Sequence, residues 1–95
     1  MNLCIAILCL LLPCAAAANP PELTGQLLYQ KNCARCHGAN GKKGASGAHD
    51  LTLSNLNAFG RTYLVTNGMG KMPAFGKKLT PEQVQQVVAY SLTLK

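Results

Sequence analysis

The sequence predicts a small all-α domain, and three observations lead to this prediction. After residue 20, apolar side chains recur in several stretches at the 3.6-residue period of a helix. Prolines and capping residues stand where these stretches begin, and glycines stand where they end. No stretch shows the alternating pattern of a half-buried β-strand, so we expect helices to be the only regular structure.

Residues 1–18 have the composition of a secretory signal peptide that is removed from the mature protein. The stretch 3–12 is almost wholly apolar, and four alanines at 15–18 supply the small residues of a signal peptidase site. The apolar stretch is shorter than the roughly 20 residues that a membrane-spanning helix needs. We therefore expect a single domain over residues 19–95, exported to the periplasm without a transmembrane span. A lipid anchor on Cys14 and a thylakoid lumen location are the alternatives.

The first helix is expected over residues 21–33. Proline and glutamate at its start suit a first helical turn, and three leucines then lie at helical spacing: Leu23, Leu27 and Leu28. Gly25 interrupts this pattern, and a glycine inside a helix costs roughly 0.5 to 1 kcal/mol relative to alanine. We expect another helix to cross close to Gly25, because a close crossing would require the missing side chain.

This helix runs into a C-x-x-C-H motif formed by Cys33, Cys36 and His37. The two thiols can add to the two vinyl groups of a haem, and the adjacent imidazole then lies under the ring, where its Nε2 can bind iron. A thiol-redox motif should instead follow a strand, and a zinc site would need two further ligands at metal spacing. The motif therefore predicts one haem c, covalently bound through Cys33 and Cys36, with His37 as an axial iron ligand.

Only Cys33 and Cys36 of the five cysteines lie outside the leader, which leaves none for a disulfide framework. About 77 residues form a marginal core on their own. A covalently bound haem would supply a large apolar face against which short helices can pack.

The middle of the chain is expected to form a loop and a second helix. Residues 38–48 are mostly glycine, alanine, asparagine and lysine, which indicates a surface loop. Ser54 or Asn57 can cap a helix that runs to about Thr66, with Asn67-Gly68 as a left-handed stop. The side chains expected to face inward are Leu56, Phe59, Tyr63 and Leu64.

The last helix has the clearest start signal. Thr80, Pro81 and Gln83 combine an N-cap threonine, a first-turn proline and a glutamine at the third helical position, which is the capping-box pattern. One face is then marked to the end of the chain by Val84, Val87, Val88, Ser91 and Leu92.

Residues 67–76, which we call the methionine strap, are too rich in glycine for a helix and too apolar for a solvent-exposed linker without a function. We expect the strap to supply the second axial ligand through Met72, because Pro73 pushes this residue toward an extended backbone. Met69 is a competing candidate, and His49 is a third. A thioether favours ferrous iron, so a His/Met pair would raise the reduction potential.

With these motifs, residues 19–95 resemble a small monohaem class I c-type cytochrome, close in pattern to the cytochrome c6 and c5 type and to the haem domains of oxidase subunits. The matching stretches are 25–29, 33–38, 50–51, 70–75 and 79–90. The resemblance implies the class I cytochrome c fold, in which three to four short helices wrap around one haem. It also implies that the first and last helices cross near Gly25 and Tyr90.

The resemblance further implies thioether bonds at Cys33 and Cys36 and axial ligation by His37 and Met72. One position departs from the family pattern. Such proteins often carry a proline before the Asp-Leu pair, and a carbonyl beside it accepts the Nδ1 proton of the proximal histidine. This chain has His49 there, so the sequence leaves open which group accepts that proton. The short connection from His37 to Met72 predicts that the haem propionates are more exposed than in longer relatives.

The charge balance predicts docking on a partner with an acidic surface. Nine lysines and arginines against three acidic residues give a net charge of +6. Basic residues flank the strap and the haem motif: Lys71, Lys77, Lys78, Arg35, Lys42 and Lys43. Nucleic acid binding is not expected, since no element is suited to enter a groove.

We expect outer-sphere electron transfer between redox proteins, by a monomer or in transient complexes, and no enzymatic activity. Two alternatives remain at this point. The domain could be a subunit of a dehydrogenase or oxidase complex. It could also act as a peroxidase or small-ligand sensor if Met72 does not bind the iron.

Overall fold

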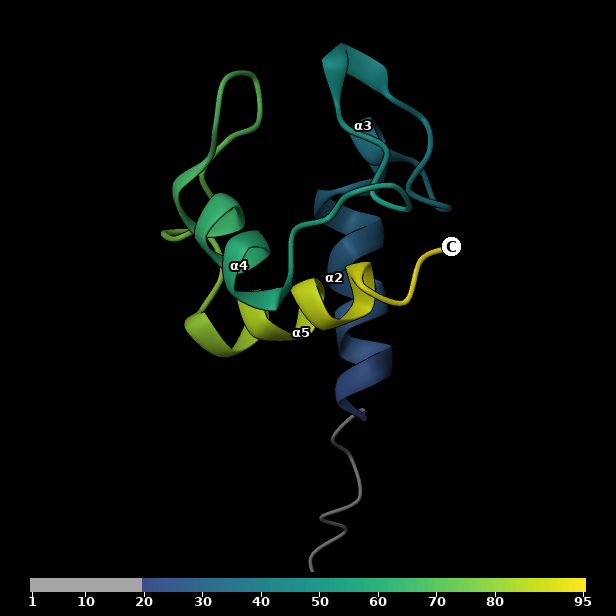
Figure 1. The fold of residues 1–95 in the computed structure, drawn as a ribbon. Helices are drawn as coiled ribbons and strands as arrows, with labels where there is room; N and C mark the ends of the chain where they lie inside the picture. The colour runs from purple at the N-terminus through teal and green to yellow at the C-terminus, as the bar shows by residue number, and fades with distance from the viewer. Residues whose placement is uncertain (1–19) are drawn as a thin grey trace, which may run out of the picture.

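The computed structural model describes residues 20–95 and is all-α in this part, as predicted. Figure 1 shows the order of its elements, which are α2 (Pro21–Asn32), α3 (Ala34–His37), the 3-10 turn η2 (Ala45–Gly47), α4 (Ala58–Asn67) and α5 (Pro81–Ser91). Strands are absent from residues 20–95, where Met69 and Met72 form an isolated bridge. The predicted signal peptide at 1–18 lies outside the described residues. None of the described helices is long and apolar enough to cross a membrane.

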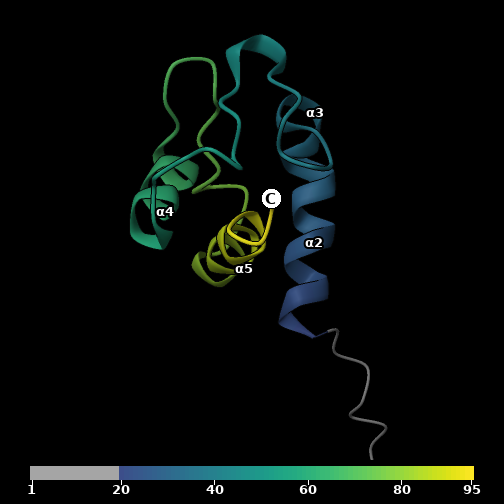
Figure 2. The ribbon, with the colours of Figure 1, turned by 45° about the vertical axis from the view of Figure 1, so that its right-hand side comes forward.

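The crossing of α2 and α5 organises the fold, and it occurs at the predicted glycine. A Cβ atom on Gly25 would collide with the backbone carbonyl of Gln86 and would lie 3.2 Å from Cβ of Tyr90. Next to the crossing, the rings of Tyr29 and Tyr90 pack with their centroids 5.3 Å apart. Figure 2 shows α5 nearly end-on beside the upright α2. The absence of a side chain at Gly25 therefore allows the two backbones to touch.

This crossing also decides which face of α2 is buried. The buried residues of α2 are Gly25 and Tyr29, whereas Leu23 and Leu27 of the leucine stripe are exposed. The leucine spacing correctly indicated a helix, but it did not mark the face that meets α5. Backbone contact at Gly25 turns the neighbouring stripe inward instead.

Helix α5 begins as the sequence predicts. The Thr80 hydroxyl accepts a hydrogen bond from the backbone N–H of Gln83 at 3.1 Å, and the Gln83 side chain accepts one from the backbone N–H of Thr80 at 2.9 Å. All of the residues expected on its inner face are buried except Leu92, which follows the end of the helix and is exposed. The buried core consists of Tyr29, Phe75, Leu79, Val84, Val87 and Val88.

Helix α4 is capped by Asn57, whose side chain accepts a hydrogen bond from the N–H of Gly60 at 3.0 Å. It ends at the predicted stop, where Gly68 has a φ of 74°. The predicted inner face is wrong for Phe59, which is 84% exposed, and for Tyr63, which is 62% exposed. Leu56 and Leu64 both line the central cavity that is described below, as expected of inward-facing residues.

The face of α4 that turns inward is fixed by its contacts with the strap. The backbone N–H groups of Phe75 and Gly76 donate to the carbonyls of Val65 and Thr66 at 2.8 and 3.1 Å. The strap therefore covers the C-terminal turn of α4, and the buried residue of this helix is Arg61. The two aromatic side chains are left on the opposite, solvent-facing side.

Replacing Gly25 with alanine should destabilise the protein by about 1 to 3 kcal/mol, the usual cost of overpacking. The steric clash with the backbone of α5 outweighs the better helix propensity of alanine. Thermal unfolding of the haem-loaded protein, followed by circular dichroism, measures the effect. Gly60→Ala in α4 is the matched control, because its Cβ would meet side-chain atoms of Leu56 and Asn57 and no backbone atom of another helix. Equal stabilities for the two variants would contradict the proposed role of the crossing.

Candidate haem site

A cavity of about 510 Å³ lies between the C-x-x-C-H segment and the methionine strap. Residues of α2, α3, α4, α5, the loop from η2 to α4 and the strap form its walls. In Figure 1, α3 with its following loop and the strap rise on opposite sides above α5. The volume falls within the range of about 300 to 1,000 Å³ typical of cofactor pockets. All four predicted site residues, Cys33, Cys36, His37 and Met72, line this one cavity.

The two cysteines enter the cavity directly after α2. Both are half-buried, and the motif follows a helix rather than a strand. Burial raises the pKa of the Cys33 thiol to about 11, and the neighbouring Cys36 adds to the rise. A catalytic thiol-redox site needs a lowered thiol pKa, because the thiolate is the reactive form. The Cys33 environment is therefore unsuited to thiol-redox catalysis.

The orientation of His37 is fixed by a hydrogen bond to the backbone. Its Nδ1 atom lies 3.0 Å from the carbonyl oxygen of His49. A carbonyl can only accept a hydrogen bond, so Nδ1 carries the proton and Nε2 keeps its free lone pair. This is the tautomer that an iron ligand requires. The position that the sequence left open is thus filled by the carbonyl of His49 itself, without proline.

Short contacts hold the loop that carries this carbonyl. The Asp50 carboxylate accepts hydrogen bonds from the Thr52 hydroxyl at 2.6 Å and from the Thr52 N–H at 2.9 Å. The hydroxyl bond is the main cause that keeps the pKa of Asp50 below its ordinary value. The N–H of Leu51 also donates to the carbonyl of Gly41 at 2.9 Å. The loop after η2 is therefore tied back onto the segment that follows the haem motif.

Tyr29 holds the other side of the motif. Its side chain is 1% exposed, and its hydroxyl donates to the carbonyl of Gly38 at 2.6 Å. Burial is the main cause that raises the pKa of Tyr29 to about 12, with smaller contributions from Cys33 and Tyr90. The tyrosine thus links the buried face of α2 to the residue directly after His37.

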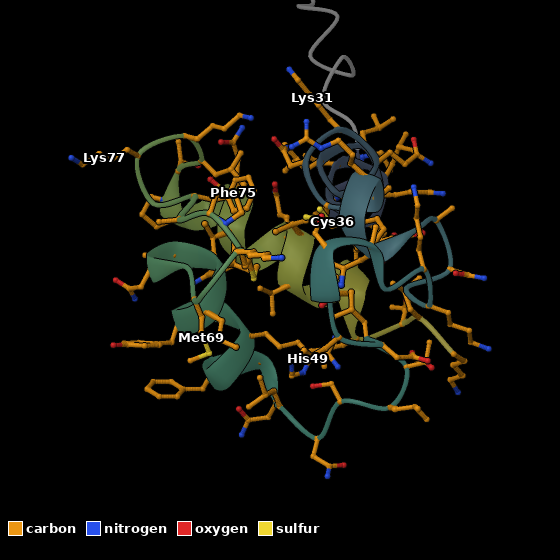
Figure 3. All side chains as sticks on the ribbon, turned by 90° about the horizontal axis from the view of Figure 1, so that it is seen from above. Lys31, Cys36, His49, Met69, Phe75 and Lys77 are labelled. Atoms are coloured by element: carbon orange, nitrogen blue, oxygen red, sulfur yellow. The ribbon has the colours of Figure 1, made fainter. Side chains whose placement is uncertain are left out.

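The strap forms a tight hairpin between its two methionines. Met69 and Met72 exchange backbone hydrogen bonds of 3.1 and 2.9 Å. Both line the cavity, but Met72 is half-buried whereas Met69 is 67% exposed. Figure 3 shows Phe75 and Cys36 toward the middle of the molecule, with Met69 and His49 farther out. The His49 side chain is exposed, so its contribution to the site is through its backbone carbonyl.

Sequence reasoning did not anticipate Arg61 as part of the cavity wall. This side chain is only 8% exposed, and burial lowers its pKa. One signal was available, because Arg61 precedes Leu64 and Val65 by three and four residues and so shares a helix face with them. An arginine in a helix is ordinarily assigned to solvent, which directed the interpretation to the aromatic residues instead.

Fold and site together define a small class I cytochrome c. The family model described as "Cytochrome C oxidase, cbb3-type, subunit III" matches residues 20–90. Cytochrome c6 of Gloeothece citriformis is 40% identical, over 72% of this chain and 66% of that protein. Cytochromes c6 of Rippkaea orientalis and Thermosynechococcus vestitus are 38% and 37% identical, over 82% and 93% of this chain and 79% and 81% of theirs. The chain belongs to the class I cytochrome c family and is similar to the cytochromes c6.

Membership confirms the predicted cofactor and class of function. The chain binds one haem c covalently, and Cys33 and Cys36 occupy the C-x-x-C-H positions at which the family attaches it. Iron is therefore the metal of the site. Cytochromes c6 are electron carriers rather than enzymes, which agrees with the prediction that this chain is not an enzyme.

Replacing Tyr29 with phenylalanine should lower the free energy of unfolding of the haem-loaded protein by about 1 kcal/mol at neutral pH, because the bond to Gly38 is lost. The folded pKa, about 12, lies above the ordinary value of 10.0. The stability that Tyr29 contributes is therefore complete below pH 10 and is lost as the pH rises toward 12. Denaturant unfolding at neutral pH and between these two values measures both effects.

The variant should accordingly lose less stability than the wild type over the alkaline range. Tyr63→Phe is the control, since Tyr63 is exposed and its substitution leaves the Gly38 carbonyl untouched. Identical alkaline profiles for wild type and Tyr29→Phe would show that the buried hydroxyl does not hold the motif.

Proposed function

We propose that the protein carries one electron on a haem c whose iron is bound by His37 and Met72. The observation that carries this proposal is the hydrogen bond from His37 Nδ1 to the His49 carbonyl, which leaves Nε2 free to bind iron. The strap closes the same cavity from the other side and presents the less exposed of its two methionines there. In this proposal, Cys33 and Cys36 form the thioether bonds.

The chain's own residues would keep this site closed while the electron passes. Tyr29 and the His49 carbonyl hold the proximal side, and the hairpin hydrogen bonds of the strap hold Met72. Buried Phe75 and Val87 line the cavity and limit water near the cofactor. The haem supplies the change of iron valence, and a site that does not rearrange suits fast outer-sphere transfer.

Met72→Ala should abolish the weak far-red absorption band that sulfur-ligated ferric haem c shows. It should also lower the reduction potential by a sizeable fraction of the roughly 0.8 V range that axial ligands span. Optical spectroscopy and potentiometry of the purified holoprotein measure both effects. Met69→Ala is the matched control and should change neither.

The reverse pattern would assign the iron ligand to Met69. Rapid binding of carbon monoxide or cyanide by the wild type would point instead to an open site, as in a peroxidase or ligand sensor.

We further propose that the electron partners have acidic docking surfaces. Lysines of the strap and the turn after it are exposed, and Figure 3 shows Lys77 projecting outward on the strap side, away from Lys31. Among Lys71, Lys77 and Lys78, the first lines the cavity. Positive charge at the mouth of a redox site raises the rate of encounter with acidic partners.

Oxidation of the ferrous protein by hexacyanoferrate(III) should slow by at least about tenfold as ionic strength rises from about 0.01 to 1 M, because the Debye length falls from about 30 to 3 Å. A cationic cobalt(III) complex should react faster over the same range. Stopped-flow absorbance measures both rates.

The double variant Lys71→Gln/Lys77→Gln should reduce this salt dependence. Lys31→Gln/Lys95→Gln removes the same charge from exposed positions outside the strap and the turn after it, and it should reduce the dependence less. Equal effects of the two double variants would indicate that only net charge matters.

A tethered role is the second candidate, and the matching family model favours it because its description names an oxidase subunit. Here the domain would still carry electrons, but within a dehydrogenase or oxidase complex. Co-purification from membranes would separate this role from that of a free carrier.

We also propose that residues 1–18 are removed on export to the periplasm. A lipidated Cys14 or transport into a thylakoid lumen remain the alternatives. The intact mass of the native protein distinguishes these forms.

A further inference from the structure

Arg61 is a buried cation whose protein partners are all uncharged. Its Nε donates to the carbonyl of Leu56 at 2.9 Å, Nη1 donates to the hydroxyl of Ser91 at 3.0 Å, and Nη2 donates to the carbonyl of Leu51 at 3.1 Å. Burial is the only cause of the lowered pKa of the guanidinium. An arginine remains charged even in such a place, so its burial without a counter-charge is costly.

The chain itself supplies little that could neutralise this charge. It has three acidic residues. The carboxylate of Asp50 accepts from Thr52, and Glu22 and Glu82 lie exposed in the first turns of α2 and α5. A counter-charge inside the cavity would therefore have to come from the cofactor.

The guanidinium also has donors to spare. Arginine carries five N–H groups in a planar fork that matches a carboxylate. Three of them are used by the protein, one on each nitrogen, so one N–H remains on each of Nη1 and Nη2. Arg61 lines the same cavity as the two cysteines and reaches it from α4 rather than from the α2–α3 side.

We propose that Arg61 forms the buried ion pair with one haem propionate. This inference rests on the proposed haem site. The propionates of a haem are attached to the two pyrrole rings that carry no vinyl group, so attachment at Cys33 and Cys36 would turn them away from these cysteines. A carboxylate on the Arg61 side of the cavity would find the two free N–H groups and a complementary charge. The expected exposure of the propionates would then apply to the other propionate only.

Arg61 is thus a positioning residue, which controls whether the haem propionate beside it is ionised. The arginine keeps the buried propionate ionised across physiological pH, and its own charge offsets the preference of that anion for ferric iron. Without Arg61, burial would raise the propionate pKa into the working range. The potential would then rise as the pH falls, because protonation removes a negative charge that stabilises the ferric state.

The test is potentiometry of the purified holoprotein between about pH 5 and 8, a range above the ordinary pKa of a carboxyl group. Wild type and Arg61→Lys, which keeps the charge, should have potentials nearly independent of pH. Arg61→Gln should have a lower potential at the alkaline end and a clear rise toward the acidic end. Lys95→Gln removes one exposed charge away from the cavity and should behave like the wild type.

Other titratable groups line this cavity and need to be separated from the propionate: Tyr29, Cys33, Cys36, His37, His49 and Lys71. The double variant Arg61→Gln/His49→Asn keeps the backbone carbonyl at position 49 and should retain the pH dependence. If the dependence disappears there, the titrating group is His49 and the proposal is wrong. The proposal is also wrong if the potential of Arg61→Gln has the same pH dependence as that of the wild type. Arg61 would then only donate hydrogen bonds to the protein.

A measurement on the wild type keeps the proposal testable if Arg61→Gln does not mature. Resonance Raman spectra of the holoprotein in H₂O and D₂O should show one propionate mode that shifts on exchange of the N–H donors and one mode typical of a solvated carboxylate. Two solvated modes would overturn the ion pair alone. A preparation that lacks the reduced α band of haem c would overturn the proposed function as well.

Discussion

The hydrogen bond between His37 and the His49 carbonyl is the interaction on which the site depends. It fixes the imidazole tautomer. It also requires the loop after η2 to bring the His49 carbonyl within hydrogen-bond distance of His37. The Asp50 turn and the bond from Leu51 to Gly41 place that loop. The hydrogen bonds of this loop thus determine that Nδ1 of His37 carries the proton and that Nε2 can bind iron.

Features with a strong local signal could be read from the sequence. The capping box at Thr80 and the C-x-x-C-H motif depend on neighbouring residues only, and both lie where they were expected. The missing side chain at Gly25 likewise predicted a close helix crossing, and the family resemblance indicated that the last helix makes it. The acceptor for His37 could not be predicted in this way, because a backbone carbonyl leaves no trace in residue identity.

The face of α4 was misjudged for a related reason. Phe59 and Tyr63 are apolar enough to suggest a core face, but α4 is rotated by its contacts with the strap and with α5. These contacts are non-local, and hydrophobicity alone cannot rank two overlapping faces of a ten-residue helix. Arg61 was overlooked because an arginine in a helix is ordinarily assigned to solvent, and the groups that hold it in the interior all lie outside α4.

Covalent attachment of the haem at the junction of α2 and α3 affects which substitutions the rest of the pocket can accept. A prosthetic group bonded to the chain cannot dissociate, so its retention does not depend on the affinity of the surrounding walls. Mutations in those walls are therefore free of the constraint that governs reversibly bound cofactors. The pocket can tolerate groups that would weaken a non-covalent complex, provided that they adjust the electrostatic environment of the metal.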